Sequence, residues 1–385
     1  MLFVLNSAGE TNMARPIIEE LKDQGTETKV LHFRHNSKSI LTEQGVLEDE
    51  DFVDGTNSFN LPSLGQAFQH PERIKTLVGT PHHVYSQLAF SKAKKLGIPV
   101  IAAVDLGIPP TKFRFRHSFY RALSFADQIV VPDESVKNRL KNRIKDCGYE
   151  IDPSKIRLGG NPGFESFRRE VDSHRSKADD YRNALGIEEK DLVLAFSSQP
   201  TPLNGAVLHL LGEAVQELAR RQPDRDIHVI FSPHARDLQD VGWKNLFGTE
   251  TSLSVPQKLQ ILQDDLGDLK QVHIHEFGNT EMKKATALAD VVVTESSTTA
   301  YEAAHSEVPA IFLRTPQHGM GTTFPAFKGV PVVNSPTGFA DAVEASKEIS
   351  TKDVAHSLSQ VVGTDVSPYL ALITGTDFQT KRTLS

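Results

Sequence analysis

The sequence predicts an α/β protein of two doubly wound parallel-sheet domains, and three observations support this fold class. The chain has 385 residues, which leaves room for two domains at roughly 150 residues each. Short β-branched runs alternate with longer helical patterns in the first half, and a second alternation follows a polar stretch. Strands that alternate with helices are typical of parallel sheets. We therefore expect Rossmann-like domains over 1–165 and 180–350, and a tail over 351–385 that can fold back on the N-terminal domain.

The first strand and helix set the pattern of the N-terminal domain. Residues 2–5 form an apolar run, and apolar residues at helical spacing over 14–22 end at Gly25, so we expect a strand and then a helix. The small and polar residues 6–11 between them are predicted to form a loop. By the same reasoning, further strands are expected at 29–33, 76–79, 99–104 and 128–131, with one helix over 85–96 and another that ends near 126.

A polar stretch over 168–182 separates the two alternations. It carries many charges and little apolar content, so we predict that it is the linker between the domains. Beyond it, strands are expected at 192–196, 227–231, 272–275, 290–294 and 310–313, with helices over 205–221, 281–289 and 299–306.

The composition excludes several classes of protein. Lys and Arg number 42 against 49 Asp and Glu, and the net charge of -7 repels a nucleic-acid backbone or an anionic bilayer. Cys147 is the only cysteine, which rules out an intramolecular disulfide and favours a reducing compartment. The first apolar run stops at Asn6, far short of the roughly 20 apolar residues of a membrane span. We expect a cytoplasmic protein, either free or peripheral at the membrane, with no nucleic-acid partner and no transmembrane segment. The composition leaves the oligomeric state open.

The strongest functional candidate is the loop after the predicted strand at 290–294. Four hydroxyl residues at 296–299 precede a helix, whose free backbone N–H groups and dipole favour a phosphate. Glu302 lies in the first turn of that helix and can accept hydrogen bonds from ribose hydroxyls. Thr299 and Glu302 also have the spacing of a capping box, which satisfies a helix end without a ligand. The pattern alone leaves both interpretations open.

Three other loops after strands carry candidate residues, because open parallel sheets bind ligands at the carboxyl ends of their strands. Glu10 follows the first strand, where a carboxylate can act as a general base, although Ser7 and Glu10 also fit a capping box. A proline turn carries His234 and Arg236, which suit a phosphate or a sugar but also suit a solvated turn. The basic segment 111–121 of this acidic protein is either an anion site or the start of a solvated helix.

The sequence lacks the common motifs for phosphate loops, hydrolase nucleophiles and zinc sites. The chain has no phosphate-cradling G-x-x-x-x-G-K-[ST] loop, no G-x-S-x-G elbow and no H-E-x-x-H zinc helix. The histidine pairs at 82–83 and 273–275 lack clustered cysteines or a flanking carboxylate set, and we interpret them as histidines of strand ends or the surface. We expect no bound metal.

Taken together and in order, these loops resemble the glycosyltransferases of the GT-B type. The passage ADQIVVP at 126–132, followed by KIRLGGNPGF at 155–164, is similar to the end of their N-terminal domain. The segment ADVVVTESSTTAYEAA at 289–304 is similar to their donor-binding motif. The resemblance covers most of the chain. It implies two Rossmann-like domains that face a cleft, with a nucleotide sugar bound between them.

Two narrower resemblances concern the activity. The stretch SAGET at 7–11, with RPIIEEL at 15–21, is similar to the start of the Kdo transferases and implies that Glu10 is the catalytic base. The UDP-N-acetylglucosamine 2-epimerases share the two-domain architecture and a similar Glu-Ala helix.

The sequence therefore predicts a glycosyltransferase of polysaccharide biosynthesis, inverting and independent of metal. It would move a sugar from a nucleotide-activated donor to a hydroxyl of a glycan, a lipid-linked glycan or a small molecule. No cofactor is expected beyond the nucleotide sugar itself, which is a co-substrate. Two alternatives stay open, namely a sugar-nucleotide epimerase and a non-catalytic protein that binds nucleotide sugars or glycans.

The candidate residues fall into three roles. Glu10 is the predicted catalytic residue. The predicted substrate-binding residues are Ser7, Gly9, Asp105, Arg114 and Arg116. The predicted donor-binding residues are Ser197, Ser198, Ser232, His234, Arg236, Glu276, Phe277, Glu295, Ser296, Ser297, Thr298, Thr299 and Glu302.

Overall fold

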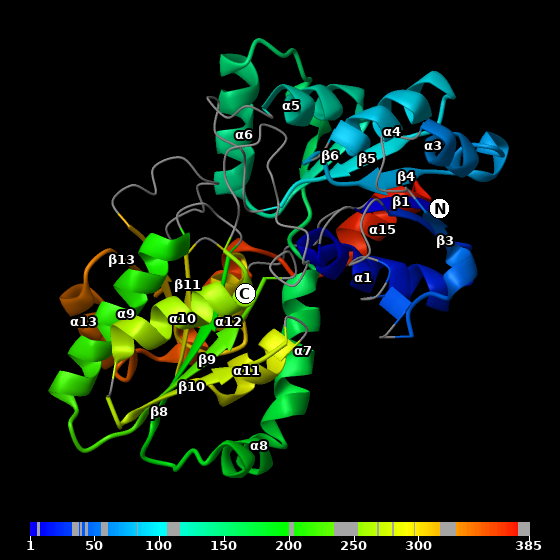
Figure 1. Ribbon diagram of the computed structural model, residues 1–385. Helices are drawn as coiled ribbons and strands as arrows, with labels where there is room; N and C mark the ends of the chain where they lie inside the picture. Colours follow the sequence, from blue (N-terminus) through cyan, green and yellow to red (C-terminus); the bar gives the residue numbers. More distant parts are fainter. Residues whose placement is uncertain are drawn as a thin grey trace. The chain divides into compact units, whose positions relative to one another are not determined.

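The computed structural model of the chain divides into two compact units, each built on its own parallel sheet (Figure 1). The first unit comprises Met1–Ser166 and the C-terminal residues from Val361, and the second comprises the residues described between Phe167 and Gln360. The predicted fold class is confirmed. The structure describes residues 1–5, 8–32, 38, 41–42, 45–54, 61–82, 84–105, 116–199, 204–234, 253–267, 269–278, 281–295, 297–315 and 329–375.

The sheet of the first unit has seven strands in the order β3-β2-β1-β4-β5-β6-β7, and every pairing is parallel. The chain starts in the middle of the sheet, builds outward through β2 and β3, and returns to the other side of β1 with β4. The strands are β1 (Leu2–Leu5), β2 (Lys29–His32), β3 (Phe52–Asp54), β4 (Leu77–Gly79), β5 (Val100–Ala103), β6 (Gln128–Val131) and β7 (Ile156–Leu158).

Helices cover both faces of this sheet, because its central strands are buried at every residue and so have apolar side chains on both faces. Ile17, Ile18 and Leu21 of the first helix pack with Tyr369 and with strand residues such as Val78 in one buried cluster. The helices are α1 (Ala8–Asp23), α3 (Leu61–Ala67), α4 (Val84–Lys95), α5 (Arg116–Phe125), α6 (Glu134–Asp146), α15 (Ser367–Thr374) and α7 (Gly163–Arg175), which runs into the second unit.

The sheet of the second unit repeats the plan with six parallel strands in the order β10-β9-β8-β11-β12-β13. Leu194, Phe196, Val229 and Phe231 form its core with α9, α10 and α13. The strands are β8 (Leu192–Ser197), β9 (Ile227–Ser232), β10 (Val272–Glu276), β11 (Val291–Thr294), β12 (Ala310–Leu313) and β13 (Val332–Val333). The helices are α8 (Ala178–Leu185), α9 (Asn204–Arg221), α10 (Val255–Leu266), α11 (Met282–Leu288), α12 (Thr299–His305), α13 (Pro336–Ser346) and α14 (Thr351–Val361).

One sequence prediction was wrong, and another segment has more helix than its prediction as a linker suggests. The loop predicted at 6–11 is largely helical, since α1 begins at Ala8, so Gly9 and Glu10 lie in a helical first turn. The linker predicted at 168–182 is also mostly helical, because α7 and α8 cover it. Although α7 carries many charged residues, it buries a narrow apolar face of Phe164, Phe167 and Val171. This face stabilises the helix against the rest of the protein.

The C-terminal residues return to the first unit through a close backbone crossing. Gly160 has φ +74°, and a Cβ placed on it would lie 1.9 Å from the carbonyl oxygen of Gly363, so only glycine fits there. The Asn161 N–H donates to that same carbonyl at 2.6 Å. The buried Tyr369 hydroxyl donates to the Gly160 carbonyl at 3.1 Å. Across the part of the chain that the structure describes, no helix has the length and apolar character needed to cross a membrane.

Candidate functional site

Each sheet has a topological switch point, where consecutive connections leave in opposite directions. In the first sheet it lies between β1 and β4, and in the second between β8 and β11. Open α/β sheets bind ligands outside the carboxyl ends of the strands at such a point. The residues that follow these four strands are therefore the first candidates for a site.

Glu10 lies directly at the switch point of the first sheet. It belongs to the first turn of α1 and is only 5% exposed. The free N–H groups of a helix N-terminus stabilise a carboxylate in this place. A Cβ placed on Gly9 would meet no atom of the described residues within 4 Å. Ser7, the other half of the predicted capping box, lies outside the described residues.

A proline inside α1 leaves one backbone carbonyl of this helix without its usual hydrogen-bond donor within the helix. Pro16 has no N–H, so it cannot donate to the carbonyl of Asn12 four residues before it. That carbonyl faces the start of α7, where a Cβ on Gly163 would lie 2.9 Å from it. Glycine at 163 thus lets α7 begin against the turn that carries Glu10.

Asp105 lies at the same edge, after β5. It is half-buried, and its Oδ1 lies 3.4 Å from Nδ2 of Asn161. The Asn161 Oδ1 in turn accepts the N–H of Gly163 at 3.1 Å. Burial first, and then the charge of Asp105, raise the pKa of the Tyr369 hydroxyl. Asp105 therefore contacts the residue that caps the start of α7, and its charge acts on Tyr369 in the first turn of α15.

His82 is a residue at this edge that the sequence prediction set aside. It follows β4, and its ring lies 5.1 Å from that of Phe119. Its Nε2 is buried and has no hydrogen-bond partner among the described residues. Burial lowers the pKa of His82 to about 4, so the imidazole is neutral near pH 7. Its position after a strand beside the switch point was the signal that could have marked it.

In the second unit, hydrogen bonds join the carboxyl ends of three adjacent strands. The Thr294 hydroxyl at the end of β11 donates to the carbonyl of Ser197 at 3.0 Å. The Ser198 N–H donates to the carbonyl of Ser232 at 3.0 Å. All four side chains are buried. The fold thus brings the predicted donor-site residues Ser197, Ser198 and Ser232 together with Thr294, which directly precedes the candidate Glu295.

The hydroxyl residues in front of α12 do not form the capping box that their spacing allows. The N-cap is Thr298, whose side chain makes no capping hydrogen bond within the described part of the chain. Thr299 is already the first helical residue, and its N–H donates to the Ser297 hydroxyl at 3.2 Å. Glu302 is buried in the first turn, and Ser296 lies outside the described residues.

Glu295 is wholly buried between this loop and the next strand end. Its carbonyl accepts a hydrogen bond from Nε of Arg314 at 3.3 Å, and the guanidinium of Arg314 lies 5.0 Å from the Phe312 ring centre. Burial lowers the pKa of Arg314 from its ordinary value. Arg314 follows β12 and was absent from the predicted donor set, although its position directly after a predicted strand could have indicated it.

The remaining candidates are less central or fall outside the described residues. His234 is half-buried after β9. Glu276 is the last residue of β10, at the edge of the sheet. Phe277 follows it and is buried, with Lys284 Nζ 4.9 Å from its ring centre. Arg114 and Arg236 lie outside the described residues, as does the side chain of Arg116, which begins α5.

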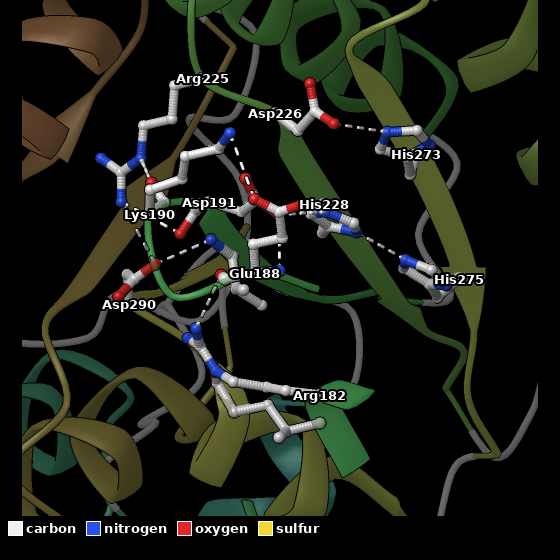
Figure 2. Close-up of polar contacts among 12 residues, drawn as sticks. Arg182, Glu188, Lys190, Asp191, Arg225, Asp226, His228, His273, His275 and Asp290 are labelled. Atoms are coloured by element: carbon white, nitrogen blue, oxygen red, sulfur yellow. Dashed lines mark hydrogen bonds and ion pairs between the residues drawn. The ribbon is translucent and has the colours of Figure 1, made fainter. Parts of the chain in front are cut away.

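The other predicted histidine group, His273 and His275 of β10, takes part in a network of polar contacts with neighbouring strands (Figure 2). His228 of β9 contacts His275 of β10 through Nδ1 and Nε2 at 2.9 Å, and its own Nε2 lies 3.3 Å from Asp191. Asp226 lies 3.3 Å from His273. Asp191 and Asp226 directly precede β8 and β9, so both carboxylates lie at the amino ends of these strands, while His275 lies one residue before the end of β10. Among the described residues, no group of three or more His, Cys, Asp or Glu is arranged to hold a metal ion.

No protein-family model matches the chain, and neither does any curated protein sequence. Several solved structures are similar over nearly its whole length. The UDP-GlcNAc 2-epimerase from Methanocaldococcus jannaschii is 17% identical with a TM-score of 0.68, over 97% of this chain and 99% of that one. The UDP-GlcNAc 2-epimerase from Neisseria meningitidis, bound to UDP-GlcNAc, is 14% identical with a TM-score of 0.66, over 97% and 98%. A glycosyltransferase from Rickettsia africae is 15% identical with a TM-score of 0.64, over 97% of both chains. The protein therefore has the GT-B fold.

Proposed function

We propose that the protein is a nucleotide-sugar enzyme that transfers a sugar to a hydroxyl acceptor. The observation that carries this proposal is the convergence of candidate residues at both switch points. Glu10 follows β1 in the first unit, while Ser197, Thr294 and their neighbours close the carboxyl ends of β8 and β11 in the second. Each switch point is a place where an open parallel sheet binds a ligand. Two of them in one chain would allow one unit to bind the donor and the other to bind the acceptor.

The second unit would bind the nucleotide part of the donor. Buried hydroxyls at the strand ends can donate hydrogen bonds to phosphate oxygens. Glu302 can accept hydrogen bonds from the ribose hydroxyls. A nucleotide sugar as ligand is also supported by the similar structure from Neisseria meningitidis, which holds UDP-GlcNAc.

Glu10 would act as the base. Its carboxylate takes the proton of the acceptor hydroxyl while the acceptor oxygen bonds to the anomeric carbon of the sugar. The bond between that carbon and the phosphate oxygen breaks, and the nucleotide leaves with the electron pair. Direct displacement from the opposite side inverts the anomeric carbon. The developing charge on the leaving phosphate is stabilised by protein donors, which is why we assign no metal to the reaction.

Epimerisation of a sugar nucleotide is the second candidate. Two of the similar structures named above are UDP-GlcNAc 2-epimerases, with TM-scores of 0.68 and 0.66. An epimerase needs acid and base groups on both faces of the sugar carbon and no acceptor. The neutral imidazole of His82, after β4, would offer a second, weak base beside the switch point of the first sheet, where Glu10 also lies.

Product analysis separates the candidates. The protein is incubated with UDP-GlcNAc alone and then with a panel of nucleotide sugars and hydroxyl acceptors, and the products are identified by NMR and mass spectrometry. Transfer predicts a glycosylated acceptor and free nucleotide, formed only when both substrates are present. Formation of the 2-epimer from UDP-GlcNAc alone would favour the second candidate. Nucleotide binding without turnover of any kind would favour a non-catalytic binding protein.

A further inference from the structure

Three helices of the first unit carry a strong excess of basic residues. Together, α4, α5 and α6 contain ten lysine and arginine residues against two acidic ones, Glu134 and Asp146. The whole chain, in contrast, has a net charge of -7. Because charges in physiological salt are screened beyond about 8 Å, a partner responds to the face that it meets rather than to the whole chain. We call the outer surface of these three helices the basic face.

The three helices lie on the same side of the first sheet (Figure 1). They connect β4 to β5, β5 to β6 and β6 to β7, which follow one another in the order of the sheet. Such crossovers between parallel strands are right-handed, so successive ones in one direction place their helices on one side. Helix α4 packs beside α5. The ring of Tyr149, just after α6, lies 6.3 Å from that of Tyr120 in α5.

Many of the charges on the basic face are not neutralised within the unit. Lys94 and Lys137 form ion pairs with Asp127 and Glu134. Other basic side chains make no ion pair with any residue that the structure describes. They are Lys92, Lys95, Arg121, Lys141 and Lys145, and all of them except the half-buried Lys141 are exposed. An uncompensated group of positive charges attracts an anionic partner.

Exposed apolar side chains accompany these charges on α4. Val84 is 40% exposed, and Leu88 and Leu96 are each 39% exposed. Lys92 and Lys95 follow Leu88 at helical spacing, so one stripe of the helix begins with apolar residues and ends with basic ones. Apolar side chains can enter the boundary of a bilayer while lysines on the same helix reach the lipid headgroups. The phosphate backbone of a nucleic acid offers no partner to the apolar part of the stripe.

We propose that the basic face docks on a bilayer that contains anionic lipids. Val84 and Leu88 enter the boundary between headgroups and acyl chains, and the lysines of α4 and α6 lie against the lipid phosphates. This inference is independent of the proposed function, because it concerns the surface that holds the protein and not the reaction. Its test therefore measures lipid binding and not turnover.

The test measures binding of the full chain to vesicles by cosedimentation. One set of vesicles is phosphatidylcholine alone, and the other is phosphatidylcholine mixed with the anionic phosphatidylglycerol. A triple variant replaces exposed lysines of the basic face, namely Lys92→Gln, Lys95→Gln and Lys145→Gln. The matched control removes the same charge from exposed lysines of the second unit, namely Lys270→Gln, Lys347→Gln and Lys352→Gln.

A second pair of variants tests the apolar part of the stripe. Leu88→Ser removes an apolar side chain from the basic face. Leu269→Ser is its control, because Leu269 is a leucine of similar exposure, 36%, in the second unit. Leu88→Ser should bind the mixed vesicles about three- to tenfold more weakly, and Leu269→Ser should bind them as the unsubstituted protein does.

We expect the unsubstituted protein to bind the mixed vesicles at least about tenfold more tightly than phosphatidylcholine vesicles, with the difference reduced at high salt. A lysine near an anionic bilayer contributes roughly fivefold in affinity. The triple variant of the basic face should therefore lose about ten- to a hundredfold, and the control triple variant should stay within about twofold.

Two sets of results would overturn the inference. One is the absence of binding to the mixed vesicles, or equal losses in the two triple variants or in the two serine variants. The other is tighter binding of a DNA duplex than of the vesicles, lost in the triple variant of the basic face, because the partner would then be a nucleic acid. None of these outcomes affects the proposed function, which is tested by product analysis.

Discussion

At the scale of single residues, the proposed chemistry depends on a few buried polar groups at strand ends. Glu10 is a carboxylate with 5% exposure in the first turn of α1. Thr11 and Arg15 of the same helix are also buried. Polar groups are costly to bury, so such a concentration beside a switch point favours a functional role for this turn.

Glu10→Gln tests that role with the smallest change of shape. The amide cannot take a proton from an acceptor, so turnover should fall by about 100- to 10,000-fold. Binding of the donor nucleotide should be unchanged, because the substitution lies in the other unit. Steady-state rates and nucleotide dissociation constants check both parts. Asp23→Asn, at the exposed last residue of α1, is the control and should behave like the unsubstituted protein. Undiminished turnover of Glu10→Gln would remove Glu10 from the mechanism.

The pKa of His82 leads to a second prediction at this scale. Burial lowers it from 6.5 to about 4 in the folded chain, so the unfolded chain binds more protons between these values. The stabilising effect of the neutral imidazole is complete above about pH 6.5 and is lost as the pH falls toward 4. It amounts to up to about 3 kcal/mol.

His82→Gln should therefore flatten the dependence of the melting temperature on pH between 6.5 and 4. Melting curves over this range measure the effect. His356→Gln, at an exposed position of α14, should leave the slope unchanged. His228 and His275 also have pKa values lowered mainly by burial, so the same acidic loss of stability should persist in part. An unaltered slope in His82→Gln would contradict the burial argument.

At the scale of the elements, the strands that the sequence predicted are those with continuous apolar runs. Every residue is buried in two of them, Leu2–Leu5 and Leu192–Ser197. Apolar runs of this kind indicate the central strands of parallel sheets. The short edge strands β3 and β13 were missed because two or three residues make no periodic pattern. Helix α10 was missed since a buried lysine interrupts its apolar face.

The crossing of Gly160 and Gly363 gives a prediction about how elements are joined. Gly160→Ala adds a Cβ into the space of the Gly363 carbonyl, so α15 has to move or the backbone has to strain. Gly25→Ala has nearly the same φ, +71°, but its Cβ would meet no described atom within 4 Å. Both substitutions cost about 1–2 kcal/mol for the left-handed backbone. Gly160→Ala should cost about 1–3 kcal/mol more from the clash.

Denaturant midpoints followed by circular dichroism measure the difference between the two alanine variants. Equal destabilisation would mean that the crossing contributes nothing. The crossing itself could not be predicted from the sequence, because Gly160 and Gly363 are far apart in the chain and neither carries a side chain whose pattern could be interpreted.

At the scale of the whole molecule, the sequence established two parallel-sheet units, and the similar structures agree on the GT-B fold. The candidate site was predictable in part. Glu10 and Glu302 could be named as candidates from their positions after predicted strands, and Ser198 from the resemblance to GT-B enzymes. The hydrogen bond that Lys258 donates to Ser198 could not be predicted, because Lys258 lies on a helix, and only the packed structure shows where its ammonium group lies.

The central claim is that the second unit binds the nucleotide of a nucleotide sugar at its switch point. The most direct measurement is a thermal-shift panel of UDP, CMP, GDP and ADP on the unsubstituted protein and on Glu302→Gln. A ligand at about a hundred times its dissociation constant adds roughly 2.7 kcal/mol of stability. We predict a clear rise in melting temperature with one of the four nucleotides, and a much smaller rise in Glu302→Gln. No rise with any nucleotide, or an equal rise in the variant, would contradict the account.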